Sequence, residues 1–495
     1  MHVHVIAVAG TGMGALAGLL RELGHRVSGS DVSFDPPMGP ALKEWGVECM
    51  TGFDPAHLEP APDLVVIGNV CRSTNPEARA AIDGGLEYTH IAGALQRFAL
   101  KGSWPLVVAG THGKTTTTAL CTWLLDQAGL HPGYLIGGIP KNFGKSFRAI
   151  KPRFALSEAG QGAIDPSSLA SAALVSRPPF VIEGDEYDTA FFEKTAKFLH
   201  YQAQTAILTS IEHDHIDIYP TESSYIEVFS SFVAQIPAQG LIVANASDAK
   251  VVAVVQASAK CGVAWYAIDG EPTHGVAPHW LGSLAESGPD GTTFDLFAGG
   301  MLVGRVVSPL SGRHNLSNLI AALGACAQGY RARFDRMIPS LTAFEGIKRR
   351  QELLGTPGQR WVYDDFAHHP TAVRETLAAL RSKHPKAPLL AVFEPRSATA
   401  CRALHQAEYP PAFRQASRVI LAPLGREGLA AGEALDTARI VRELEQAGVP
   451  AHAATNLDQV LELIVEHSVA GGVVALLSNG AFGGMHGRVL QALRD

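Results

Sequence analysis

Residues 107–120 read VVAGTHGKTTTTAL, and this stretch decides the fold expected for the middle of the chain. An apolar strand leads into a glycine-bearing turn, and a helical segment follows. Lysine and threonine directly after such a turn are typical of a phosphate-binding loop, in which Lys114 neutralises phosphate oxygens and Thr115 binds Mg²⁺. The usual spacing would place a glycine where Val108 stands, five residues before Gly113, so the loop is a shortened variant. A threonine-rich helix that binds no ligand is the alternative interpretation.

A second glycine-rich turn lies near the N-terminus, where VIAVAG leads into TGMGALAGLL. Gly10, Gly12 and Gly14 would let the backbone approach a pyrophosphate, whose charge is favoured at a helix N-terminus. Asp31 ends the next expected strand, where such folds contact a ribose or a base. The motif alone is equally compatible with a turn that binds nothing.

The composition predicts a well-packed soluble protein of several domains. Of the 495 residues, 46% are apolar and 18% are charged, which argues against disorder and against a single core. The first residues, MHVHVIAVAG, do not resemble a secretory signal, and no apolar run reaches membrane-spanning length. The net charge of −7 argues against broad nucleic-acid binding. The six scattered cysteines contain no Cys-x-x-Cys pair, so we expect reduced thiols in a cytoplasmic protein.

Strand and helix patterns alternate along the chain and predict α/β domains with parallel sheets. Lys101–Pro105 is interrupted by Gly and Pro and is a plausible linker, and residues 270–291 are rich in loop formers. The stretch TTFDLFAGGMLVGRVV predicts a β-hairpin around Gly299 and Gly300, and HNLSNLIAALGACAQG predicts a helix. A third block starts near Gly346. We therefore expect three consecutive α/β domains over residues 1–103, 104–344 and 345–495.

Two polar clusters follow apolar strands in the central block. The first, VIEGDEYD, contains Glu183, Asp185, Glu186 and Asp188, and these carboxylates suit a hard cation such as Mg²⁺ at the end of a strand. The second, SIEHDHIDIY, contains His213 and His215. It could form a zinc site, a solvated acidic loop, or a source of one histidine for the metal beside the phosphate loop. Consecutive residues cannot all face one ion, and zinc hydrolases use spaced ligands, so we favour the last interpretation.

Six motifs together resemble one family. GTHGKTTT, EGDEYD, DHID, HNLSN, KRR and DDFAHHP occur in the order found in the Mur ligases, and the resemblance covers essentially the whole chain. These enzymes use ATP to join amino acids or peptides to UDP-N-acetylmuramate in cell-wall synthesis. The resemblance implies an N-terminal Rossmann-like UDP-binding domain, a central P-loop ATPase-like domain and a C-terminal Rossmann-like domain. A nicotinamide oxidoreductase would leave GTHGKTTT and EGDEYD without a function, and the density of chemical residues at strand ends argues against a non-catalytic scaffold.

Four stretches resemble the family branch that ligates a murein tripeptide in peptidoglycan recycling. They are FVIEGDEYDTAFFEKTAKF, GIKRRQELLG, FEPRSATA and LLSNGAFGGMHGRVL. The resemblance implies that UDP-N-acetylmuramate is joined to L-alanyl-γ-D-glutamyl-meso-diaminopimelate through an acyl phosphate, with the L-alanine ligase branch as the alternative. It implies ATP and Mg²⁺ as cofactors and a monomer or weak homodimer, with no nucleic-acid or membrane partner. Many members carry a carbamoylated lysine after the DH histidine, but no lysine occurs here between Asp214 and Lys250, and Phe229 stands near its place.

The resemblance also assigns roles to individual residues. The catalytic residues would be Lys114, Glu183, His215 and Arg350. The metal ligands would be Thr115, Glu183 and His215. ATP would contact Gly110, Thr111, His112, Gly113, Lys114, Thr115, Thr116, His314, Asn315, Asn318, Arg350 and Asp365, with the histidine and the two asparagines framing the adenine. UDP would contact Gly10, Thr11, Gly12, Met13, Gly14 and Asp31. Candidates for the peptide are His368, Arg396, Ser397, Arg402 and Asn479.

Overall fold

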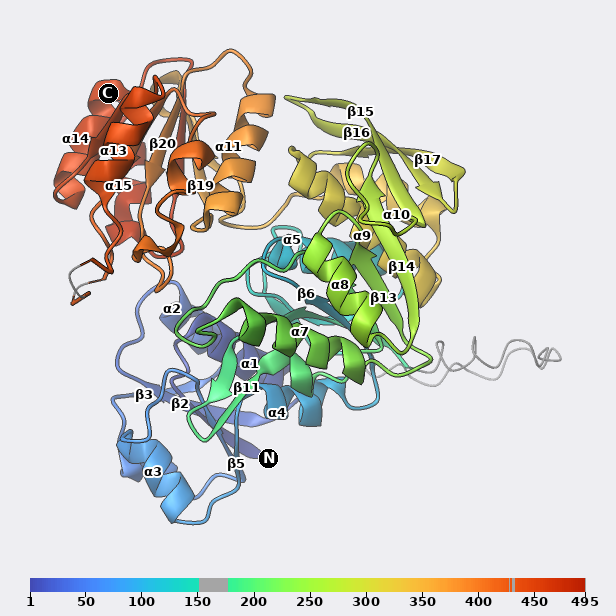
Figure 1. Cartoon of the computed structure of the whole chain (residues 1–495). Coiled ribbons are helices and arrows are strands. Elements are labelled where there is room, and N and C mark those ends of the chain that lie inside the picture. Colours follow the sequence, from blue (N-terminus) through green and yellow to red (C-terminus); the bar gives the residue numbers. More distant parts are fainter. Residues whose placement is uncertain (151–176, 427, 430–431, 495) are drawn as a thin grey trace. The chain divides into compact units, whose positions relative to one another are not determined.

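The computed structural model describes residues 1–150, 177–426, 428–429 and 432–494, which form two compact units (Figure 1). The first unit contains residues 1–211, 223–280 and 319–340, and the second contains residues 212–222, 281–318 and 341–495. Residues 151–176 belong to the domain expected over residues 104–344 and lie outside the described residues. All six cysteines are free thiols. Among the described helices, none combines the length and apolar character needed to cross a membrane.

Five parallel strands form the first sheet, in the order β3-β2-β1-β4-β5. The strands are β1 (His2–Ile6), β2 (Arg26–Asp31), β3 (Glu48–Thr51), β4 (Leu64–Ile67) and β5 (Tyr88–Thr89). The helices are α1 (Thr11–Glu22), α2 (Met38–Glu44), α3 (Pro76–Asp83) and α4 (Ile91–Leu95). Because β2 and β4 flank β1 on opposite sides, the strand order reverses at β1. Ligand crevices in such sheets form at the carboxyl ends of the strands beside this reversal.

The central sheet of the first unit has the order β14-β13-β12-β6-β9-β7-β8, with only the β7–β8 pair antiparallel among the strand pairs described there. Its strands are β6 (Trp104–Ala109), β7 (Gly133–Leu135), β8 (Phe147–Arg148), β9 (Pro179–Gly184), β12 (Thr205–Leu208), β13 (Leu241–Asn245) and β14 (Gly262–Ile268). A separate hairpin consists of β10 (Asp188–Ala190) and β11 (Glu193–Ala196). The helices are α5 (Lys114–Gln127), α7 (Glu222–Gln235), α8 (Ala249–Ser258), α9 (Arg313–Tyr330) and α10 (Phe334–Ser340). Strands β9, β6 and β12 are neighbours, so the segments that follow them meet at one edge of the sheet.

Two expectations about irregular segments, one at the first domain boundary and one inside the middle domain, need correction. Trp104 and Pro105 are not linker residues but start β6, where a proline is tolerated because the strand has only begun. Residues 270–291 are not a continuous loop, since β15 (Trp280–Gly288) lies within them. The expected hairpin is confirmed by β16 (Gly291–Ala298) and β17 (Met301–Ser308), which pair antiparallel across Gly299 and Gly300. The expected helix is α9.

The C-terminal sheet has the order β18-β19-β23-β20-β21-β22, and only the β18–β19 pair is antiparallel among its described strands. Its strands are β18 (Glu352–Gly355), β19 (Trp361–Asp365), β20 (Leu389–Phe393), β21 (Arg418–Leu421), β22 (Ala451–Ala453) and β23 (Val473–Leu477). Side chains alternate between two cores, as the pleat requires. One core contains side chains from α11 (Pro370–Lys383), α12 (Tyr409–Ala412) and α13 (Thr437–Gln446). The other contains side chains from α14 (Leu457–His467) and α15 (Met485–Ala492), so helices cover both faces.

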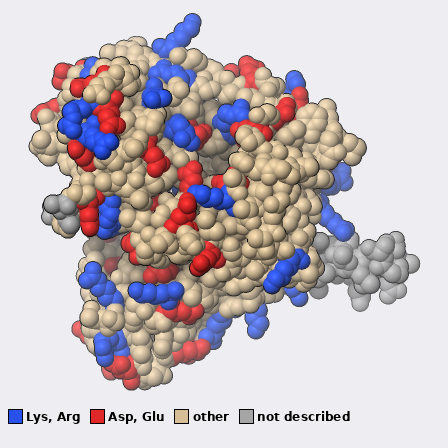
Figure 2. Space-filling view, viewed as in Figure 1, with Lys and Arg blue, Asp and Glu red and all other residues tan. Residues whose placement is uncertain are grey.

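Charged side chains are distributed in a mixed pattern over the face shown in Figure 2, where basic and acidic groups alternate. The three sheets and their covering helices agree with the α/β class expected from the sequence.

Candidate active site

The turn between β6 and α5 is a tight loop that requires glycine. Gly110 has a φ of +131° and Gly113 has a φ of +79°, both in the region that side chains disfavour. A Cβ atom on Gly110 would also lie 2.9 Å from the backbone of Ser210. Ser210, which follows β12, anchors the loop, because Thr111 N–H donates to its carbonyl at 2.9 Å and His112 N–H donates to its hydroxyl at 3.1 Å. The loop shape is therefore set by two adjacent strand ends.

Lys114 lies in this loop in an ion pair with a buried carboxylate. Its ammonium group is 2.9 Å and 3.1 Å from the two oxygens of Glu186 and donates to the Gly110 carbonyl at 2.7 Å. Burial lowers the pKa of Lys114, but Glu186 and the neighbouring carboxylates outweigh it and raise that pKa. The cation is thus held charged at the site where a phosphate would bind.

Glu186 also connects Lys114 to a tyrosine outside the loop. Tyr225, on α7, donates its hydroxyl proton to Glu186 at 3.2 Å and lies 3.1 Å from the Thr111 hydroxyl. Since the single tyrosine proton goes to the carboxylate, the Thr111 hydroxyl donates to Tyr225. Sequence reasoning grouped Glu186 with carboxylates that suit a cation, did not pair it with Lys114, and gave Tyr225 no role. Glu186 could have been selected from the motif EGDEYD, whereas no pattern in the sequence indicates that α7 lies beside the loop.

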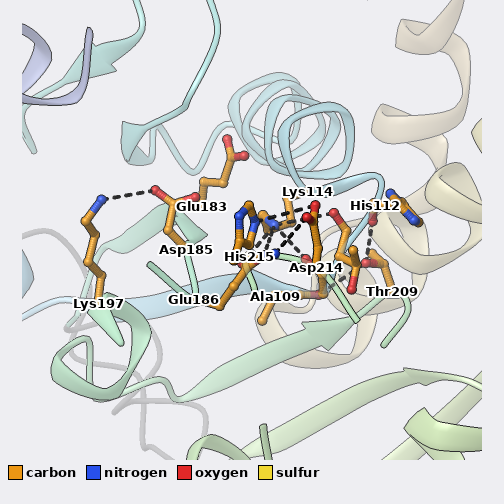
Figure 3. A network of polar contacts seen from close by, with 12 residues as sticks. Ala109, His112, Lys114, Glu183, Asp185, Glu186, Lys197, Thr209, Asp214 and His215 are labelled. Atoms are coloured by element: carbon orange, nitrogen blue, oxygen red, sulfur yellow. Dashed lines mark hydrogen bonds and ion pairs between the residues drawn. The ribbon is translucent and has the colours of Figure 1, made fainter. Parts of the chain in front are cut away.

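Hard oxygen donors meet next to the lysine. Thr115 donates its hydroxyl to Glu183 at 2.8 Å, and the other carboxylate oxygen of Glu183 accepts from Gly137 N–H at 2.8 Å. Burial and the charge of Asp185 raise the pKa of Glu183, against the opposing effect of Lys114. Asp185 lies 3.7 Å from Lys197 (Figure 3). A hydroxyl and a carboxylate in contact are ligands of the kind that Mg²⁺ prefers, so the residues present fit this ion.

The N-terminal turn is built with backbone groups. Gly10, Thr11 and Gly12 are exposed, and Gly10 caps α1 without a side-chain hydrogen bond, so the first N–H groups of this helix face outward. Met13 is buried, which limits any ligand contact there to its backbone. Asp31 accepts from Ala9 N–H at 2.8 Å and from Val32 N–H at 2.7 Å, so both of its oxygens hold the turn in place.

The second unit contains the remaining candidates for nucleotide and metal. His215 has a φ of +54°, and its N–H donates to the Asp214 carboxylate at 2.7 Å. Burial raises the pKa of Asp214, but His215, His368 and the Thr399 hydroxyl lower it well below its usual range. His368 itself is buried, which lowers its pKa.

Asp365 is a second buried carboxylate in this unit. It accepts from Gln351 N–H at 2.7 Å and from Ala367 N–H at 2.8 Å, and burial raises its pKa while Arg350 opposes that shift. The guanidinium of Arg350 lies over the Phe366 ring at 4.9 Å. His314 is 3.1 Å from the Gln351 amide. These contacts bring Arg350, Asp365 and His314 to one place.

Asn315 and Asn318 lie at the start of α9 and are both buried. Asn318 donates to the Asn315 side chain at 3.4 Å, and Asn315 donates to the Ser311 carbonyl at 2.8 Å. Asn318 is therefore not a residue of an exposed helix surface.

The peptide candidates divide into two groups. Arg396 lies 3.5 Å from Glu394 at the end of β20 and packs beside Gly480, whereas Ser478, after β23, donates its hydroxyl to Glu394. The side-chain oxygen of Asn479 is buried without a hydrogen-bond partner among the described residues.

Ser397 and Arg402 instead support their own loop. The Ser397 hydroxyl accepts from Ala400 N–H at 3.0 Å, and Arg402 donates to the Ala398 carbonyl at 2.9 Å. Sequence reasoning missed Arg349, which donates to the carbonyls of Ser478 and Gly480 at 2.6 Å each. Arg349 could have been selected from the KRR motif, in which only Arg350 was chosen as a candidate.

Comparisons with known proteins agree with this architecture. Sequence profiles of the Mur ligase family, catalytic domain, of the Mur ligase middle domain and of the Mur ligase, glutamate ligase domain match residues 2–102, 108–326 and 349–480. The UDP-N-acetylmuramate–L-alanyl-γ-D-glutamyl-meso-2,6-diaminoheptandioate ligase of Haemophilus influenzae is 36% identical over 494 residues, which cover 100% of this chain and 99% of the relative. A UDP-N-acetylmuramate–L-alanine ligase of Roseiflexus sp. is 33% identical over 82% of this chain and 81% of the relative.

A solved structure gives the same result in three dimensions. The crystal structure of a murein peptide ligase from Psychrobacter arcticus matches with a TM-score of 0.71 and 32% identity, covering 100% of this chain and 99% of that one. The chain belongs to the Mur ligase family and is an ATP-dependent enzyme that forms amide bonds.

Proposed function

We propose that the enzyme joins the tripeptide L-alanyl-γ-D-glutamyl-meso-diaminopimelate to UDP-N-acetylmuramate in peptidoglycan recycling. The observation that carries the proposal is the full-length similarity to the H. influenzae ligase whose name contains this tripeptide, at 36% identity over 100% of the chain. The similarity to the Roseiflexus L-alanine ligase covers 82% of the chain. L-Alanine ligation remains the second candidate because the same amine would attack in both reactions. The proposed domains are residues 1–103, 104–344 and 345–495.

Each of the two glycine turns would bind a different nucleotide. The exposed backbone of residues 10–12, at the start of α1, would bind the UDP pyrophosphate. Residues 110–116 would surround the ATP phosphates, with Lys114 exchanging its Glu186 partner for phosphate oxygens. His314, Asn315 and Asn318 would frame the adenine, Asp365 would contact the ribose, and Arg350 would contact the phosphates.

Thr115 and Glu183 would hold Mg²⁺, with His215 as a ligand of a second ion. The contact between the Thr115 hydroxyl and the Glu183 carboxylate supports this assignment, since both oxygens are hard donors. When bound, Mg²⁺ neutralises phosphate charge during phosphoryl transfer.

The chemistry proceeds in two displacements. The lactyl carboxylate of UDP-N-acetylmuramate attacks the γ-phosphorus of ATP, ADP leaves, and an acyl phosphate forms. The alanyl amine of the peptide then attacks the acyl carbon, loses a proton, and expels inorganic phosphate. Lys114, which Glu186 holds charged before ATP binds, stabilises the negative charge that develops on the phosphate oxygens. The partly buried loop supplies positioning, which such reactions require more than covalent catalysis.

Acceptor preference tests the proposal. Phosphate release is measured with ATP and UDP-N-acetylmuramate at saturation, and kcat/KM is compared between the tripeptide and free L-alanine. We expect the tripeptide to be preferred by at least about tenfold, because its distal carboxylates add binding energy that can orient the amine. Equal or better use of L-alanine would contradict the proposal and favour the second candidate.

A pair of variants sharpens the test. Arg396→Ala should lower kcat/KM for the tripeptide and leave that for L-alanine near its wild-type value, since Arg396 lies at the end of β20 beside Gly480. Arg442→Ala is the matched control, because Arg442 is exposed on α13. Equal losses for both acceptors would show that Arg396 does not contact the peptide.

A further inference from the structure

A cluster of two histidines and one glutamate lies in the first unit, among residues to which the proposed reaction gives no role. His90 caps α4, Glu193 belongs to β11, and His200 ends the short 3₁₀ helix at Lys197–His200. One ring nitrogen from each histidine and one carboxylate oxygen lie within 4.8 Å of one another. We propose that these three residues form a binding site for a borderline transition-metal dication, with Zn²⁺ as the expected ion.

The distances suit such an ion. The Nε2 atom of His90 is 3.2 Å from one oxygen of Glu193, and the Nε2 atom of His200 is 3.6 Å from the other. Ligands of a tetrahedral zinc ion with bonds of about 2.0–2.1 Å are separated by about 3.3 Å. Each imidazole therefore lies close to the required distance from a different oxygen of Glu193 before any ion binds, so the carboxylate connects the two rings.

The donor set and its surroundings also favour zinc over magnesium. Two imidazoles and one carboxylate are the ligands of many zinc sites, whereas magnesium prefers oxygen donors and several waters. His90 is 3% exposed and contacts Phe192, so one side of the site is dry.

Three existing hydrogen bonds would have to change on binding, and one of them joins the His90 Nε2 atom to Glu193. The Nδ1 atom of His90 accepts from Gly93 N–H at 3.2 Å, so its proton now resides on Nε2. An ion at Nε2 moves that proton to Nδ1 and removes the bond from Gly93, which limits the affinity. The Thr195 hydroxyl, 2.7 Å from the His200 Nε2 atom, would move aside toward the fourth ligand position.

The site would connect two parts of the first unit. His90 lies in the region matched by the N-terminal family domain, and Glu193 and His200 lie in the middle domain. Aromatic contacts already join these parts, since Tyr88 packs against Phe192 at 5.1 Å. A bound ion would add a coordinate link at the same junction and should raise the melting temperature by mass action.

Metal titration of the full chain tests the site. The protein is stripped with a chelator, returned to buffer with millimolar Mg²⁺ to occupy oxygen-rich sites, and titrated with Co²⁺, whose visible absorption reports tetrahedral coordination. Zn²⁺ then competes for the bound Co²⁺. We expect one saturable equivalent with an intense tetrahedral spectrum, displaced by Zn²⁺ and not by Mg²⁺. The absence of a tetrahedral signal would overturn the proposal.

Variants test whether the Co²⁺ absorption comes from an ion bound by His90, Glu193 and His200. His200→Asn and Glu193→Gln alter partly exposed side chains and should weaken Co²⁺ binding by at least about tenfold each. His131→Asn is the matched control, since His131 is exposed beside a single carboxylate, Asp126, at 3.5 Å. Melting curves without metal show that each variant is folded. Wild-type affinity in both His200→Asn and Glu193→Gln would place the ion elsewhere and overturn the assignment.

Discussion

The turn after β6 and the turn after β1 each join a parallel strand to a helix, yet they are completed in different ways. Residues 110–115 contain a lysine in an ion pair with Glu186 and a threonine in contact with Glu183. Residues 10–14 contain no charged side chain, and their backbone is held by Asp31 from the neighbouring strand. The central turn therefore concentrates charge, whereas the N-terminal turn offers backbone N–H groups.

This difference separates two roles that the same supersecondary unit can perform. Charge held in a buried loop can stabilise the changing charge of a transition state. Backbone donors at a helix start bind a pyrophosphate that does not react. We expect substitutions in the central turn to change kcat, and substitutions in the N-terminal turn to change the KM for UDP-N-acetylmuramate.

The largest effect should follow Lys114→Ala. Loss of the ammonium group should lower kcat by at least about 100-fold, because preorganised charge at the transferring phosphoryl group supplies much of the transition-state stabilisation. Phosphate release with all three substrates measures the loss.

The buried partner of Lys114 requires a control. Lys114→Ala leaves Glu186 without its cation in a fully buried position, which destabilises a fold on its own. The double variant with Glu186→Gln removes that buried charge and should restore the melting temperature but not the activity. Near-normal turnover in either folded variant would show that the reaction does not need the charge of Lys114. It would contradict the proposed difference between the two turns.

Gly110→Ala should produce the next largest effect, on stability. The φ of +131° at Gly110 disfavours a side chain, and a new Cβ would press on the Ser210 backbone. Backbone strain of this kind costs about 1–3 kcal/mol, and the contact adds to it. The melting temperature of the unfolding transition measures the loss. A variant that melts with the wild type would show that the loop relaxes without cost.

The sequence predicted secondary structure correctly where a single local segment determines it, as two examples show. The strand, turn and helix around Gly113 follow from apolar pattern and glycine placement, and the hairpin at Gly299 follows from its alternation. Strand β15 was missed because WLGSLAESG lacks a sustained apolar alternation, and its strand conformation depends on pairing with β16.

Long-range pairings in the site could not be predicted in the same way. The EGDEYD motif contains four carboxylates, and only the fold decides that Glu186 pairs with Lys114 while Glu183 contacts Thr115. Tyr225 reaches Glu186 from a helix 39 residues further along the chain. Spacing identifies the residue types at a site, but their partners depend on which strand ends are neighbours.

Asp31→Ala should have a moderate effect confined to the N-terminal turn. The substitution removes the acceptor for Ala9 N–H and Val32 N–H, so the turn loses part of its preorganisation. Charge-assisted hydrogen bonds contribute about 1.5–3 kcal/mol, and we expect the KM for UDP-N-acetylmuramate to rise about tenfold or more with kcat little changed. Asp35→Ala is the control, because Asp35 is exposed and accepts from Ser33. A fall in kcat without a change in KM would contradict the separation.

The smallest effect on stability should come from Gly12→Ala, which adds the same carbon atom as Gly110→Ala. Gly12 lies inside α1 with an ordinary helical backbone, and a Cβ there would be 3.6 Å from the Ile91 side chain, a normal contact. Alanine is favoured over glycine in a helix by up to about 1 kcal/mol, so the melting temperature should stay constant or rise slightly. The exposed face of the turn would nevertheless carry a methyl group where a pyrophosphate must approach the backbone. Calorimetric binding of UDP-N-acetylmuramate should therefore weaken in a protein that is at least as stable as the wild type. Unchanged affinity would show that the ligand does not approach Gly12, and the N-terminal turn would then be a structural connection rather than the sugar-nucleotide site.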